Sequence, residues 1–179
     1  MRRSFVALLV TGLCAVPLTA SAQEKGKVGV TMGFPAAAGV IWHATEKIAV
    51  RPEFNFSHSS TDTPFGEGSS DSFGLGVSAL FYTAKWDNVA AYIAPRFAWA
   101  HSSGESQSDL VDIDNESSAD SYNYSGSFGA QAWIGRRFSV YGETGLAFSH
   151  GTADSSLGSG ESKGKGFNIR SGVGAVFYF

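Results

Sequence analysis

The chain has 179 residues, a formal net charge of −3 and a mean hydropathy of −0.03. Only 16% of its residues are charged, and so weak a net charge argues against a nucleic-acid-binding protein, which would show a strong basic bias. An aromatic content of 13% argues against a disordered chain. Beyond the N-terminus no apolar run has the length of a membrane helix, which excludes a helical membrane protein.

The first 22 residues have the organisation of a secretory signal. Two arginines precede an apolar run over residues 5–16, and a small Ala-Ser-Ala cleavage motif ends at Ala22. A retained membrane helix is the alternative, but the apolar run is too short for it. We therefore expect a signal peptide over residues 1–22 and a single mature domain over residues 23–179. The only cysteine, Cys14, lies in the signal, so no disulfide is expected in the mature domain.

The mature chain alternates between apolar and polar residues with a period of two, which is typical of strands with one apolar face. We predict eight strands, at residues 28–34, 38–43, 48–58, 72–84, 89–101, 122–135, 138–150 and 167–179. Pro52 and Pro95 fall within predicted strands, on the apolar parity. Because proline has no N–H for the ladder, we expect a β-bulge at each.

The predicted connections alternate between short turns and long loops. The long loops are rich in Ser, Gly and Asp and cover residues 59–71, 102–121 and 151–166; the first carries a net charge of −3, the second −6, and the third is neutral. The connection at 35–37, on the same side, is short. This alternation is typical of an up-and-down barrel with one elaborated rim.

The distribution of charge and aromatic residues indicates which face of the barrel is inside. All formal charges within the predicted strands lie on the less apolar parity: Arg51, Glu53, Arg96, Glu143 and Arg170. The rest of that parity is mostly small and weakly polar, which suits a crowded interior. Aromatic residues gather near both strand ends, like the two girdles of a bilayer-spanning barrel. The sequence therefore predicts an all-β, eight-stranded antiparallel transmembrane β-barrel.

The whole mature chain resembles small outer-membrane barrels of the OmpA/OmpX type. Its last strand ends in Phe179, with Phe177 two residues earlier, and this ending resembles the signal read by the barrel assembly machinery. The resemblance implies export to the outer membrane of a Gram-negative envelope, contact with outer-membrane lipid and lipopolysaccharide, and a monomeric barrel. Because the sequence ends at Phe179, we do not expect the peptidoglycan-binding domain of some relatives.

The five inward charges are the first candidate site. Together with Tyr92 and Gln131 they are expected to point into a lumen too narrow for an open channel. Buried charges must be paired, and their mixed signs favour a structural ion-pair network over an ion-selective ring. A small gated pore is the alternative.

Three histidines, His58, His101 and His150, end predicted strands at equivalent places, and the first two precede Ser-Ser. A histidine can activate a nearby serine for acyl hydrolysis, an arrangement that resembles outer-membrane lipid A deacylases. Such a site also needs a carboxylate that orients the histidine, and the sequence shows none on the right parity. We therefore expect no enzyme, with a lipid A-modifying acyl hydrolase as the alternative.

The acidic loop over residues 102–121 is the only metal candidate. Four of its acids match ligand positions of a calcium-binding loop: Asp112, Asp114, Glu116 and Asp120. The required glycine is replaced by Ser117 and the final glutamate by Asn123, so the match is poor and we expect neither metal nor cofactor. The expected function is a structural or surface-interaction role in the envelope through acidic extracellular loops, with no nucleic-acid partner.

Overall fold

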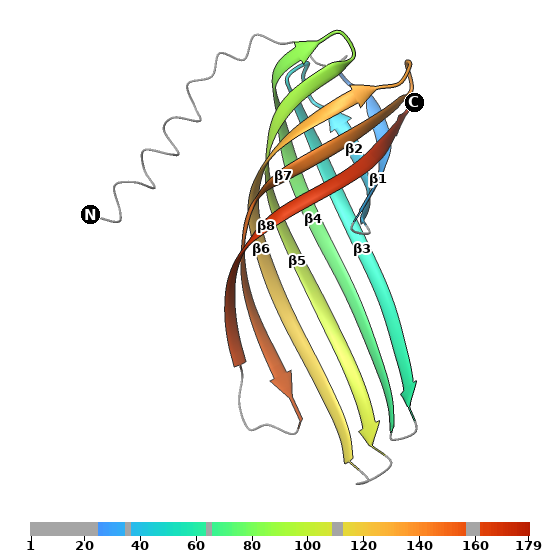
Figure 1. Ribbon diagram of the computed structural model, residues 1–179, viewed down its shortest axis with the longest axis vertical. Coiled ribbons are helices and arrows are strands. Elements are labelled where there is room, and N and C mark those ends of the chain that lie inside the picture. The colour runs from blue at the N-terminus through green and yellow to red at the C-terminus, as the bar shows by residue number, and fades with distance from the viewer. Residues whose placement is uncertain (1–24, 35–36, 64–65, 109–112, 157–161) are drawn as a thin grey trace, which may run out of the picture.

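Eight antiparallel strands close into one barrel in sequence order in this computed structural model, which describes residues 25–34, 37–63, 66–108, 113–156 and 162–179 (Figure 1). The strands are β1 (Val28–Phe34), β2 (Ala37–His43), β3 (Ile48–Thr63), β4 (Gly66–Trp86), β5 (Val89–Ser108), β6 (Ile113–Trp133), β7 (Phe138–Ser155) and β8 (Ser162–Tyr178). The predicted fold class is confirmed. No helix in the described ranges is long and apolar enough to span a membrane. The predicted signal peptide over residues 1–22 lies outside the described residues.

The predicted parity separates the two faces of the barrel wall. On β7, Val140 and Leu146 are exposed on the outside, whereas Tyr141 and Glu143 are buried inside. The same holds for the other strands, and the exposed set includes aromatic residues near both ends of the wall: Trp42, Phe56, Phe73, Phe138, Phe148, Phe167 and Phe177. The barrel therefore has an apolar exterior around an interior in which tyrosines and small apolar residues lie together with buried polar and charged residues.

The two strand prolines interrupt their hydrogen-bond ladders without a β-bulge, so the prediction of a bulge at each proline is wrong. The β2–β3 pairing skips Pro52 and the β4–β5 pairing skips Pro95, and in each case the register is the same on both sides of the gap. The missing N–H removes hydrogen bonds to one neighbouring strand, but no residue is inserted. The register shift of the β4–β5 ladder lies instead between Tyr82 and Ala84.

The long loops predicted at residues 59–71, 102–121 and 151–166 are largely strand, which corrects the sequence-based boundaries. The hairpins β3–β4, β5–β6 and β7–β8 stay paired almost to their tips. In Figure 1 these hairpins extend to the lower end of the barrel, which we call the hairpin end. The opposite end, where the C-terminus lies, is called the terminal end. At the hairpin end both faces of the sheet are polar, so the alternation disappears from the sequence while backbone pairing continues.

The barrel wall is incomplete on one side. Strands β1 and β2 have seven residues each, whereas the other six strands have 16 to 21. Pairing of β1 with β8 ends at Val173, and pairing of β2 with β3 ends at Phe54. Beyond these points β8 and β3 have no partner on that side among the described residues, and they diverge in Figure 1. The barrel is closed only in its terminal half and continues as a curved six-stranded sheet.

Candidate functional site

Aromatic and amide side chains fill the closed half of the barrel. The Tyr82 hydroxyl donates to Gln131 Oε1 at 2.6 Å, and Gln131 Nε2 donates to Ser139 Oγ at 2.7 Å and to the Tyr178 hydroxyl at 2.8 Å. His43 Nε2 lies 3.2 Å from the same Tyr178 hydroxyl. All five residues are fully buried, so the lumen here is packed with side chains.

Glycines make room for the tyrosines of this interior. A Cβ atom at Gly129 would collide with the ring of Tyr92, and one at Gly174 would collide with the ring of Tyr141. Any larger residue at these positions would push a buried ring out of a packed core, which typically costs about 1–3 kcal/mol. The high glycine content of the sequence thus has a packing cause at these two positions.

The first carboxylate of the ion cluster, Glu143, binds two arginines and a tyrosine. Its oxygens accept hydrogen bonds from Arg51 Nη2 at 3.0 and 3.1 Å, from Arg170 Nη1 at 2.7 Å and from the Tyr92 hydroxyl at 3.2 Å. These partners come from β3, β8 and β5, so one carboxylate connects four strands across the lumen.

The second carboxylate, Glu53, completes the cluster. Arg96 Nε donates to its Oε2 at 2.9 Å, and Arg51 Nε forms an ion pair with its Oε1 at 3.0 Å. The Arg51 guanidinium also lies over the Tyr141 ring, 4.7 Å from its centroid. The structure brings all five predicted inward charges together, with Tyr92. Three arginines against two glutamates leave the cluster with one net positive charge.

The cluster lies where the closed half of the barrel ends. Glu53 is opposite Gly39, near the tip of the β1–β2 hairpin, and Glu143 is opposite Gly172, just beyond the last β1 partner. The Arg51 side chain is only 2% exposed, whereas that of Arg96 is 16% and that of Arg170 is 24% exposed. The two outer arginines therefore face the open half of the barrel.

The predicted assembly signal lies at the end of β8. Phe177 and Phe179 are both exposed on the outer wall, and their rings meet edge to face with centroids 5.8 Å apart. Neither ring is part of the packed interior.

The outer-wall histidines do have carboxylate partners, which corrects the sequence-based expectation. His58 Nδ1 lies 2.7 Å from Asp71 Oδ1, and His101 Nδ1 lies 3.1 Å from Asp120 Oδ1. Each aspartate lies directly across the hairpin from its histidine. Sequence reasoning missed both because it assigned Asp71 and Asp120 to loops; recognising the hairpins would have placed them opposite the histidines.

Each of these pairs has the histidine and the aspartate of a hydrolytic Ser-His-Asp triad but lacks the serine in the part of the chain that the structure describes. Among the described residues, no serine hydroxyl forms a hydrogen bond with the imidazole of His58 or His101. Asp120 also accepts a hydrogen bond from Trp99 Nε1 at 3.1 Å. The third histidine, His150, is opposite Lys165. The pairs thus form polar contacts beside the aromatic residues of the outer wall.

The four metal candidates do not form a calcium-binding loop. Asp112 lies outside the described residues, and the other three belong to the extended strand β6. Glu116 is exposed, and Asp120 is bound to Trp99 and His101. No group of three or more His, Cys, Asp or Glu residues in the described ranges could hold a metal ion.

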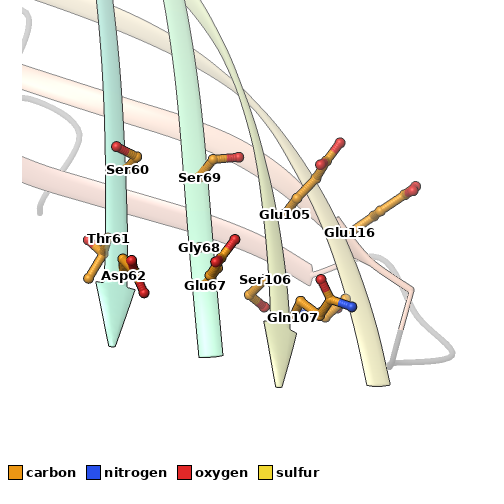
Figure 2. Close-up of a pocket in the computed structure, with 11 residues that line it drawn as sticks. Ser60, Thr61, Asp62, Glu67, Gly68, Ser69, Glu105, Ser106, Gln107 and Glu116 are labelled. Atoms are coloured by element: carbon orange, nitrogen blue, oxygen red, sulfur yellow. The ribbon is translucent and has the colours of Figure 1, made fainter. Parts of the chain in front are cut away.

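An acidic concavity of about 500 Å³ lies at the tips of β3 to β6 (Figure 2). Its lining includes two like-charged pairs on directly opposed positions, Asp62 with Glu67 and Glu105 with Glu116. Such pairs are destabilising in a sheet, and this cost is tolerated only because the side chains are in water. The four carboxylates of the concavity make this part of the hairpin end strongly negative.

The chain matches no protein-family model and no curated protein. It is similar to the crystal structure of a major outer membrane protein from Thermus thermophilus, with a TM-score of 0.58 and 12% identity over 86% of this chain and 98% of that chain. The fold is that of an outer-membrane β-barrel. Two Acinetobacter baumannii structures, CarO and CarO2, match at 12% identity with TM-scores of 0.41 and 0.42, over 87% and 86% of this chain and 98% and 97% of theirs. These matches do not single out the OmpA/OmpX type.

Proposed function

We propose that the protein is a non-enzymatic outer-membrane barrel of a Gram-negative envelope, with a structural or surface-interaction role. The observation that carries this proposal is the apolar outer wall around a buried ion cluster. Exposed phenylalanines, leucines and valines encircle the strands, and such a wall is stable only where lipid surrounds it. On β8 this apolar stretch runs from Phe167 to Phe179, longer than the roughly 9–11 residues with which a tilted strand crosses a bilayer.

The hairpin end is the part that would meet other molecules outside the cell. It is built from Ser, Gly and acidic residues, and its concavity carries four carboxylates without a base in its lining. Such a surface favours cationic partners, or lipopolysaccharide phosphates held through shared divalent cations. The terminal end would then face the periplasm. We expect a monomer that reaches this place by signal-directed export and the barrel assembly machinery.

The protein should not conduct ions. Planar bilayers with the refolded protein should show no current steps, because Tyr82, Gln131 and Tyr178 fill the closed half of the lumen. A Tyr82→Ser/Tyr178→Ser variant removes two of the buried rings and provides the control that a current can be detected. Regular steps from the unaltered protein would support the gated pore instead.

The protein should also leave lipid A unmodified, because its His–Asp pairs lack a bound serine. Mass spectra of lipid A from cells with and without the protein are expected to be identical. Loss of an acyl chain that depends on the protein, and that His101→Ala or Asp120→Asn abolishes, would establish the hydrolase alternative.

A further inference from the structure

In the open half of the barrel the inner face of the curved six-stranded sheet, which we call the trough, is left uncovered at a gap in the wall. The gap lies between the unpaired edges of β3, over residues 55–63, and β8, over residues 162–172. Pairing of β8 with β1 ends at Val173, in the middle of the apolar stretch from Phe167 to Phe179. If the proposed membrane placement holds, the hairpin-side half of the apolar band is therefore open sideways towards lipid.

The trough is lined by small uncharged residues. The alternation of each strand places these side chains on the inner face beyond the ion cluster: Ser57, Ser72, Ser102, Ser121, Asn123 and Asn168. No acidic residue occupies the inner face beyond Glu53 and Glu143 in the described strands. Asn123 Oδ1 and Ser125 Oγ are buried without a hydrogen-bond partner among the described residues. Buried polar atoms of this kind are normally satisfied by water or a ligand.

The floor of the trough is positively charged. Arg96 binds Glu53 through Nε, and Arg170 binds Glu143 through Nη1. The described residues offer no second acceptor to either guanidinium, and both are partly exposed towards the trough. Arginine donors in pairs match carboxylate and phosphate groups, so the floor suits an anionic headgroup.

The gap has apolar residues at its corner between β1 and β8. Ile169 on β8 and Phe34 at the end of β1 are 77% and 76% exposed, the highest values among the large apolar residues described. A groove of about 460 Å³ runs from Phe34 and Val173 across the outer wall of β8, β7 and β6. An apolar chain could thus lie against this part of the outer wall, beside the open edge of β8.

We propose that the trough binds an anionic single-chain amphiphile, which enters sideways between β3 and β8 and places its carboxylate or phosphate on Arg96 and Arg170. The inference rests on the proposed membrane placement and adds a ligand class to it. A free anion would make no use of the exposed Phe34 and Ile169, and a neutral lipid would make no use of the positive charge of the floor.

The test is a binding titration with the protein in phosphatidylcholine nanodiscs. Dodecanoate and dodecyl phosphate are the probes, and dodecylphosphocholine and inorganic phosphate are the comparisons. We expect one or both anionic amphiphiles to bind saturably, and the tighter of the two identifies the preferred headgroup. The double variant Arg96→Gln/Arg170→Gln should weaken this binding by about tenfold or more. Arg136→Gln, at the β6–β7 turn, removes one positive charge outside the trough and should bind like the unaltered protein.

A second measurement keeps the inference falsifiable if the double variant does not fold. A photoreactive dodecanoate should crosslink to the edges of β3 and β8 in the unaltered protein. Crosslinks elsewhere on the wall would overturn the proposal. So would inorganic phosphate that binds as tightly as the anionic amphiphiles, or a double variant that binds them as tightly as the unaltered protein. Disulfides between two copies carrying Ser57→Cys and Asn168→Cys would show that a second copy occupies the gap, and they would overturn it too. A protein that inserts into nanodiscs but binds no probe refutes this inference alone; failure to insert refutes the proposed function.

Discussion

Replacing Glu143 by glutamine should cost the barrel about 3–5 kcal/mol of unfolding free energy. The carboxylate is almost fully buried and binds Arg51 and Arg170 at once. Its neutral substitute would leave the buried Arg51 with one carboxylate and Arg170, at the floor of the trough, with none. Urea titration of the refolded protein in detergent, followed by tryptophan fluorescence, measures the loss.

Two variants make this result specific. Glu105→Gln removes an exposed carboxylate near the hairpin tips, and its effect should stay within about 0.5 kcal/mol. Glu53→Gln removes the partner of Arg96, and a clear loss is expected there also. An E143Q protein as stable as the unaltered one would mean that the cluster is solvated, and the description of a filled lumen would be wrong.

Phe179→Ser should abolish assembly in cells while leaving the folded barrel almost unchanged. Recognition of a terminal strand depends on its exposed side chains and its backbone, and the Phe179 side chain is mostly exposed, with its ring against that of Phe177. Outer-membrane fractions of a Gram-negative host should therefore contain little of the variant. The same variant refolded in detergent should unfold within about 0.5 kcal/mol of the unaltered protein.

Phe167→Ser is the matched control, because it removes an exposed ring from the opposite end of the same apolar stretch. It should assemble normally. Equal loss of both variants would indicate that any exposed aromatic residue on β8 matters for insertion, and it would remove the special role assigned to the C-terminal phenylalanine.

The sequence predicts the strands well where the two faces of the wall differ. Between Phe167 and Phe179, alternate residues face opposite sides, and this difference gives the sequence its period of two. The same parity identifies the five residues of the ion cluster. Beyond Phe167 both faces are polar, the period disappears, and the paired hairpins look like loops.

Features that depend on pairing between strands could not be predicted in the same way. The partners of His58 and His101 are set by hairpin register, which places Asp71 and Asp120 beside them. The gap in the wall is another such feature. The shortness of the first two strands is visible in the sequence, but its consequence depends on where β1 stops along β8.

In a membrane, the apolar outer wall should face lipid and the trough should hold water. Single spin labels at Leu146→Cys and Ser149→Cys, on opposite faces of β7, test this directly in lipid vesicles. Cys14→Ala makes each label unique. We predict that the label at position 146 collides with oxygen dissolved in the bilayer and avoids a water-soluble nickel complex, and that the label at 149 does the opposite. Free access of the nickel complex to position 146 would contradict the membrane barrel.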